Sequence, residues 1–287
     1  MSERITFIGY GEAGQAFARS GDRAFDRKTL DPDLRGGKLA DYMAGAVIGC
    51  DSAAEALAGA TAILSLVTAD QALPAAQDYA AALAPGTLWL DMNSVAPGTK
   101  GAAADAIEAA GGRYVDVAVM SPVLPARHAV PLLVAGPHAE AGAAALKAIG
   151  FTNVGIVGAE IGAASAIKMI RSVMVKGIEA LSAECILAAN RAGVAEAVLA
   201  SLDASWKPQG WEARIDYNLD RMLAHGLRRA AEMEEVVKTL EQLGVEPGMT
   251  RYTVVQQRRI GSLGLTPPEG LAAKLDAIER GAGEHAA

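Results

Sequence analysis

The residues best suited to chemistry lie near the start of the chain, where an apolar, β-prone run (residues 4–8) leads directly into a glycine-rich turn. The turn reads Gly9-Tyr10-Gly11-Glu12-Ala13-Gly14, with GxGxxG spacing. Gly9 permits a tight turn, Gly11 lets the main chain approach a pyrophosphate, and Gly14 lets the following helix pack closely on a sheet. The first N–H groups of that helix would face the phosphates. The sequence therefore predicts that these six residues bind a dinucleotide.

An acidic residue stands where the second strand of such a fold would end. Residues 23–25 have the pattern of a short strand, and Asp26 follows them, twelve residues after Gly14. A carboxylate at this place can accept hydrogen bonds from the ribose of NAD, whereas the next residues, Arg27 and Lys28, could hold the extra phosphate of NADP. We expect NAD or NADP as the cofactor, with NAD slightly favoured.

A lysine opens the second half of the chain. Lys168 has apolar neighbours, and Arg171 and Lys176 lie on nearby turns of the same predicted helix. Burial and nearby cations lower the pKa of a lysine, which would supply a neutral amine able to take a proton from a hydroxyl group. Lys168 is therefore a candidate for catalysis; the alternative is a surface lysine on an amphipathic helix.

Further along, several polar side chains recur at helical spacing. His225, Arg228, Arg229 and Glu232 lie three or four residues apart and would share one helix face. His225 and Arg228 are candidates for binding a carboxylate or phosphate, although a salt-bridged face or a dimer contact fits equally well. His128 is expected to be polar surface.

The elements that must position these residues change type at mid-chain. Short apolar runs alternate with alanine-rich helical segments up to about residue 158, which predicts an α/β Rossmann domain with a doubly wound, mostly parallel sheet. From residue 161 the pattern is helical, with helices expected over 163–192, 194–205, 213–223, 227–243, 249–263 and 268–278. We expect a dinucleotide-binding domain over residues 1–160, an all-α domain for substrate binding and dimerisation over 161–287, and a disordered tail from 281.

The composition of the chain argues against several classes of binding partner. The formal charge of −7 comes without a basic stripe, which argues against nucleic acid. No apolar run reaches the roughly 20 residues of a membrane helix, and the first strand leaves no room for a signal peptide. Cys50 and Cys185 lack metal-ligand spacing, so we expect both to be reduced and buried, in a cytoplasmic protein without a bound metal.

Four stretches together resemble the β-hydroxyacid dehydrogenases, a family that includes 3-hydroxyisobutyrate and 6-phosphogluconate dehydrogenases. The family has a glycine, a lysine six residues later and an asparagine four beyond; here these places hold Gly162, Lys168 and Ser172. Residues 91–97 resemble its Asp-x-Ser/Thr-x-x-x-Pro segment, and residues 67–70 its loop beneath the nicotinamide ribose. The substrate loop, usually Ser-Gly-Gly, reads Met120-Ser121-Pro122, which marks a divergent branch.

The resemblance implies roles for these residues. Lys168 would be the general acid/base, with Ser172 beside it in place of the asparagine. Substrate contacts would come from Ser94, Ser121, Pro122 and Arg171, and further cofactor contacts from Val67, Thr68 and Asn93. The implied substrate is a β-hydroxy acid or a related small carboxylate, and the implied assembly is a homodimer or higher homo-oligomer.

Three alternatives remain open at this point. An oxidative decarboxylase of a sugar acid, like 6-phosphogluconate dehydrogenase, would have the same motifs. Imine reductases share the architecture, but they tend to carry aspartate or tyrosine at the place of Lys168. A non-catalytic dinucleotide-binding protein would bind cofactor without turnover.

Overall fold

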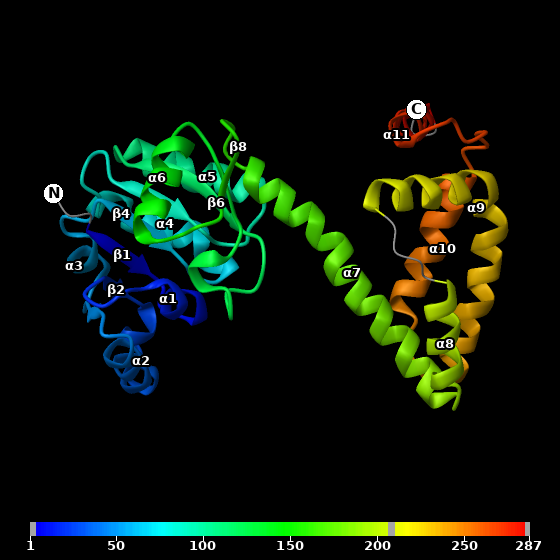
Figure 1. Ribbon diagram of the computed structural model, residues 1–287, viewed down its shortest axis with the longest axis horizontal. Coiled ribbons are helices and arrows are strands. Elements are labelled where there is room, and N and C mark those ends of the chain that lie inside the picture. The colour runs from blue at the N-terminus through cyan, green and yellow to red at the C-terminus, as the bar shows by residue number, and fades with distance from the viewer. Residues whose placement is uncertain (1–3, 206–209, 285–287) are drawn as a thin grey trace. The chain divides into compact units, whose positions relative to one another are not determined.

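A computed structural model describes residues 4–205 and 210–284. Eight strands form one sheet in the order β3-β2-β1-β4-β5-β6-β7-β8, and every neighbouring pair is parallel except β6 with β7 (Figure 1). The strands are β1 (Ile5–Ile8), β2 (Arg23–Phe25), β3 (Ile48–Gly49), β4 (Ala62–Ser65), β5 (Leu88–Asp91), β6 (Arg113–Val119), β7 (Leu132–Ala135) and β8 (Val154–Gly158). The predicted doubly wound, mostly parallel sheet is confirmed.

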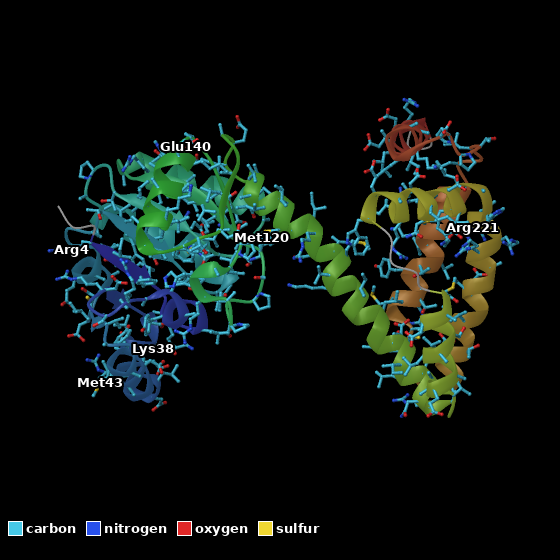
Figure 2. The ribbon with its side chains drawn as sticks, viewed as in Figure 1. Arg4, Lys38, Met43, Met120, Glu140 and Arg221 are labelled. Carbon is cyan, nitrogen blue, oxygen red and sulfur yellow. The ribbon has the colours of Figure 1, made fainter. Side chains whose placement is uncertain are left out.

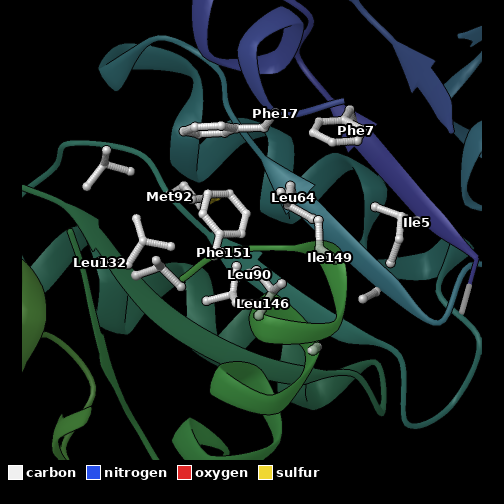
Figure 3. Packing of buried hydrophobic residues seen from close by; sticks show 14 of the residues in the cluster. Ile5, Phe7, Phe17, Leu64, Leu90, Met92, Leu132, Leu146, Ile149 and Phe151 are labelled. Carbon is white, nitrogen blue, oxygen red and sulfur yellow. The ribbon is translucent and has the colours of Figure 1, made fainter. Parts of the chain in front are cut away.

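Helices cover both faces of this sheet. They are α1 (Glu12–Phe17), α2 (Pro32–Ala44), α3 (Ala53–Leu57), α4 (Ala72–Tyr79), α5 (Pro97–Ala109) and α6 (Ala139–Ile149). Successive residues of a strand point to opposite faces. Leu90 therefore lies near Leu146 of α6 in a cluster that also includes Phe17 of α1 (Figure 3), while Trp89 belongs to the other cluster, with Ile107 of α5. The parallel strands are therefore apolar on both sides, as a sheet between two helix layers requires.

The rest of the described chain is helical. Its helices are α7 (Ala163–Arg191), α8 (Ala195–Ser205), α9 (Trp211–Gln242), α10 (Gly248–Gly261) and α11 (Leu271–Glu284). Helices α9 and α10 lie side by side (Figure 1), and Gly226 meets Gly261 where their main chains come into contact. The buried carboxylate of Glu184 on α7 accepts hydrogen bonds from the main-chain N–H groups of Met249 and Thr250, at 2.9 and 3.0 Å, which caps α10.

The chain divides into two compact units, which we call the sheet unit (residues 1–173) and the helical unit (residues 174–287). The division falls within α7, so the first three turns of this helix, including Lys168, belong to the sheet unit. The domain boundary predicted between residues 160 and 161 lies just before this helix and stays a prediction.

Three details differ from the sequence predictions. The helices expected over 213–223 and 227–243 form the single helix α9, because Ala224–Gly226 continue the helical hydrogen bonding where a break was expected. Helix α11 extends through residue 284 into the predicted tail, whose last residues, 285–287, lie outside the described part. Cys50 is buried as expected, but Cys185 is exposed because it lies on an uncovered side of α7.

Helices long and apolar enough to cross a membrane do not occur within residues 4–205 and 210–284.

Candidate active site

Two cavities adjoin at the carboxyl ends of the central strands. The first has a volume of about 460 Å³, and its lining includes Gly9, Gly11, Asp26, Arg27 and Thr68. The second, of about 340 Å³, is lined by Glu12, Ala13, Asn93, Ser94, Ser121, Pro122 and Lys168, among others. Leu66 and Val67 line both cavities, so the two are neighbours at the edge where parallel sheets bind ligands.

The glycine turn has the geometry that a dinucleotide requires. Gly9 has φ +88°, and a Cβ atom there would lie 2.4 Å from the main-chain oxygen of Leu66, so a side chain is excluded. Gly11 lines the first cavity, and a Cβ atom there would meet nothing within 4 Å. The turn therefore leaves open the space that a pyrophosphate would fill.

The turn is held from behind by Tyr10 and Lys38. The N–H group of Tyr10 donates to Asp26 Oδ2 at 2.9 Å, and the buried ammonium of Lys38 donates to the Tyr10 main-chain oxygen at 2.7 Å. The ring of Tyr10 is fully buried and packs 5.2 Å from that of Tyr42, so only the main chain of Tyr10 can face a cofactor. Lys38, on α2 (Figure 2), is a supporting residue that the sequence analysis missed.

Asp26 faces its own main chain more than it faces the cavity. It is 9% exposed; Oδ2 accepts from Tyr10, and Oδ1 accepts from the N–H group of Lys28 at 3.0 Å. Arg27 and Lys28 are exposed at the rim of the first cavity, where the Arg27 guanidinium donates to Gln71 Oε1. Two cations therefore stand at the end of β2 beside a carboxylate that is already hydrogen-bonded.

The second cavity brings Lys168 to Ser94. The Lys168 ammonium donates to Ser94 Oγ at 2.5 Å, although the two residues are 74 positions apart in the sequence. Ser94 follows Asn93, whose side chain accepts from the N–H group of Val67 at 2.8 Å and donates to Ser65 Oγ at 3.0 Å. Asn93 thus ties the ends of β4 and β5 together and places Ser94 opposite α7.

The remaining predicted residues of α7 lie near this pair without lining the described part of either cavity. Ser172 Oγ donates to the main-chain oxygen of Lys168 at 2.8 Å, a bond within the helix. Arg171 is exposed and reaches the main-chain oxygen of Met120, the residue before Ser121, at 3.5 Å. Gly14 is buried under the turn, with space for no Cβ atom because Gly9 O would lie 2.9 Å away.

His225 and Arg228 both lie on α9, in the helical unit, and both are exposed. Neither is among the described residues that line a polar cavity of about 280 Å³ in that unit. Arg221 (Figure 2), Arg229 and Gln257 line that cavity, together with Tyr217, Asn218 and Met222. Of the four polar residues that the sequence placed on one helix face, Arg229 lines this cavity, whereas the predicted anion-binding residues His225 and Arg228 do not.

Comparison with known families agrees with the geometry of the first cavity. Residues 4–158, more than half of the chain, match the NAD binding domain of 6-phosphogluconate dehydrogenase. The chain belongs to this family. It therefore carries the NAD(P)-binding domain of 6-phosphogluconate dehydrogenase-like oxidoreductases. Residues 189–260 match a domain of unknown function, DUF1932. Among curated proteins there is no match.

Solved structures extend the similarity to the whole chain. A conserved hypothetical protein from Sinorhizobium meliloti 1021 is 36% identical over 98% of this chain and 97% of its own, with a TM-score of 0.59. A conserved protein of unknown function, described as structurally similar to 3-hydroxyacid dehydrogenases, is 27% identical over 97% and 99%, with a TM-score of 0.55. An imine reductase from Pseudomonas sp. is 17% identical over 97% and 100%, with a TM-score of 0.71, which shows a shared fold.

Proposed function

We propose that this protein is an NAD(P)-dependent oxidoreductase that interconverts a hydroxyl and a carbonyl group on a β-hydroxy acid or a related small carboxylate. The observation that carries the proposal is the Lys168–Ser94 pair in a cavity that shares Leu66 and Val67 with the dinucleotide cavity. Lys168, which could transfer a proton, would therefore lie near the nicotinamide of a bound cofactor. The nicotinamide, when bound, supplies the hydride acceptor or donor.

The remaining steps, proton transfer and substrate binding, would be carried out by residues in and near the second cavity. In the oxidative direction the Lys168 amine would take the hydroxyl proton, and in the reductive direction the ammonium would return it. Because Lys168 donates to Ser94 Oγ, the hydroxyl hydrogen of Ser94 can point outward to a substrate oxygen. Ser121 offers a second hydroxyl group, and the positive charge of Arg171 nearby favours a carboxylate.

For the cofactor, we propose a preference for NADP over NAD, the opposite of the slight preference that the sequence suggested. Asp26 has both carboxylate oxygens bonded to main-chain N–H groups and is almost buried, which leaves it poorly placed for ribose hydroxyl groups. Arg27 and Lys28 are exposed at the same rim and could pair with a 2′-phosphate. Both features support the phosphorylated cofactor.

An initial-rate screen tests the proposal. Purified protein is assayed by nicotinamide absorbance with NAD and NADP against β-hydroxy acids, aldonates and phosphorylated sugar acids. We expect turnover with a carboxylate substrate and a higher kcat/KM with NADP. Lys168→Ala should lower kcat by about 10²–10⁴-fold with cofactor affinity unchanged, whereas Lys176→Ala, an exposed lysine of the same helix, should be neutral. Full turnover in Lys168→Ala contradicts the catalytic role.

The same screen separates the alternatives. Carbon dioxide captured in step with cofactor reduction would identify an oxidative decarboxylase. Cyclic imines added to the panel would reveal imine reduction. We do not expect this activity, because position 168 holds lysine where imine reductases tend to carry aspartate or tyrosine. Tight cofactor binding with no turnover on any compound would favour a dinucleotide-binding protein without catalysis.

A further inference from the structure

Beneath the candidate site lies a buried ion cluster that the proposed reaction does not use. The ammonium of Lys100, on α5, is fully buried; it lies 3.0 Å from Asp91 Oδ1 and 3.4 Å from Asp116 Oδ1. It also donates to the main-chain oxygen of Asp91 at 2.6 Å. Both carboxylates have 0% exposure, and they come from the neighbouring strands β5 and β6. Lys100 is therefore the shared counter-ion of two buried acids.

The first acid, Asp91, holds the segment that carries Ser94. Its Oδ1 accepts from the main-chain N–H and the side-chain amide of Asn93, at 2.9 and 2.8 Å. Its Oδ2 accepts from the Tyr114 hydroxyl at 2.7 Å, and burial beside Asp91 raises the pKa of that hydroxyl far above its usual value, so it remains a donor. Asp91 thus fixes Asn93, and with it the position of Ser94.

The second acid, Asp116, holds the start of the helix that carries Lys168. Its Oδ2 accepts from the N–H groups of Gly162 and Ser165, each at 3.1 Å, and so caps the first turn of α7. Its Oδ1 is buried and makes no hydrogen bond, which leaves the ammonium of Lys100 to balance its charge. Lys168 stands one turn further along α7.

We infer that Lys100 is a positioning residue: it joins Asp91 and Asp116, and through them it sets the distance between Ser94 and Lys168. The inference rests on the proposed role of Lys168. Each member of the catalytic pair is anchored to a different carboxylate, and Lys100 contacts both carboxylates. A displacement of about 1 Å between reacting groups can cost about 100-fold in rate, so the linkage matters for kcat.

The test is Lys100→Met, which keeps the length of the side chain and removes its charge, compared with Lys147→Met at an exposed site on α6. We expect kcat to fall about 100-fold with KM and cofactor affinity changed little. The second readout needs no substrate: acylation of Lys168 by an amine-reactive ester is followed against pH by peptide mass spectrometry. In Lys100→Met the rate or its pH midpoint should change at Lys168 and stay constant at Lys176.

Lys100→Met leaves two buried carboxylates without a counter-ion and can fail to fold for that reason. The double variant Lys100→Met/Asp116→Asn removes one charge of each sign and keeps an oxygen that can accept from Gly162 and Ser165. We expect it to fold and still to show an altered Lys168 acylation profile and a kcat at least about tenfold lower, because the ionic link through Lys100 is absent, although Ser165 Oγ still donates to the main-chain oxygen of Val95.

If the ion cluster only stabilises the fold, folded variants should keep the wild-type kcat and the wild-type acylation of Lys168. If a folded variant retains the wild-type acylation profile of Lys168, or a wild-type kcat, Lys100 does not position the pair and the inference is wrong. Acylation is measured without turnover, so this outcome is distinct from a failure of the proposed reaction, in which wild-type protein oxidises no acid.

Discussion

The sheet unit and the helical unit bury their apolar side chains to different extents. In the sheet unit, two clusters fill the spaces between the sheet and its two helix layers, and they include fully buried Leu90 and Trp89. In the described part of the helical unit the clusters are small, Ala188 with Leu240 and Val245 being one of them. Helix α8 has no buried residue, and Leu199 on it is 50% exposed. A sheet between helix layers closes its own core, whereas these helices leave apolar faces uncovered.

Buried charged groups occur in both units, but they are more completely enclosed in the sheet unit. Lys100, Asp91 and Asp116 are completely buried in the sheet unit, where each has a specific partner. Some ion pairs of the helical unit, such as Arg251 with Glu241, lie largely in solvent and contribute little to stability, whereas Lys274 is buried beside the partly exposed Asp216. The candidate catalytic residues Lys168 and Ser94 lie in the sheet unit, which also contains the fully buried ion cluster.

The sharpest test of this contrast is a matched pair of leucine truncations. Leu90→Ala removes buried methyl groups from a packed core and should cost about 2–5 kcal/mol. Leu199→Ala removes the same groups from an exposed helix face and should change stability by less than about 0.5 kcal/mol. Urea unfolding at low protein concentration measures both. Equal losses would mean that the helical unit has a core of its own around α8.

Helices α9 and α10 pack with their main chains in contact, and Gly226→Ala probes this contact. A Cβ atom there would lie 2.4 Å from the main-chain oxygen of Gln257 and 2.7 Å from Gly261 Cα, so the helices must move apart. We expect a loss of about 1–3 kcal/mol. The control is Gly177→Ala in α7, where a Cβ atom meets nothing and should stabilise the helix by about 0.5–1 kcal/mol. Thermal unfolding followed by circular dichroism compares them.

The uncovered apolar face of α7 predicts that a second copy of the chain covers it. Ile167, Ile170, Met174, Ile178 and Leu181 are exposed and recur every three or four residues, as in a helix-pairing stripe. We expect a homodimer, with Ile178→Asp weakening it about tenfold or more because association would bury a carboxylate. Sedimentation equilibrium measures the dissociation constant, and Met43→Asp on exposed α2 serves as the control. A monomeric wild-type protein contradicts the prediction.

The smallest expected effect concerns His128. Burial lowers the pKa of its imidazole below the usual 6.5; its ring lies 4.9 Å from that of Phe151, and its Nε2 is buried without a hydrogen bond. The unfolded chain therefore binds the proton more readily, and stability should fall as pH drops below about 6.5. His128→Phe should reduce the loss of Tm between pH 7 and 5 by about 1–2 °C. An identical pH dependence in both proteins would show that His128 does not contribute.

Local patterns were sufficient for much of the fold. The GxGxxG turn, the alternating strands and helices and the change to helices after residue 160 depend on neighbours in sequence, and they appear in the structure. The expectation for His128 was wrong: it is half-buried against Phe17 and Phe151, because the chain on which it lies folds back over α1. Such burial depends on residues more than 20 positions away, which a local pattern does not contain.

The partners of Lys100 could not be predicted from a local sequence pattern either. It shares a helical spacing with Ala103, Ala104 and Ile107, so the sequence contained a sign that it faces the core. The helical spacing does not identify the partners of Lys100, because Asp91 and Asp116 come close to it only when β5 and β6 pair beneath α5.

By itself, then, the sequence determined the dinucleotide turn and the fold class, because short-range periodicity and glycine spacing encode them. The candidate lysine came from the resemblance to the β-hydroxyacid dehydrogenases. Only the tertiary structure decided that Lys168 meets Ser94, that Asp26 is turned toward its own main chain and that Ser172 bonds within its helix. The physical reason is that each of these contacts depends on the direction of a side chain and on strand register, which are fixed when the packed elements come together.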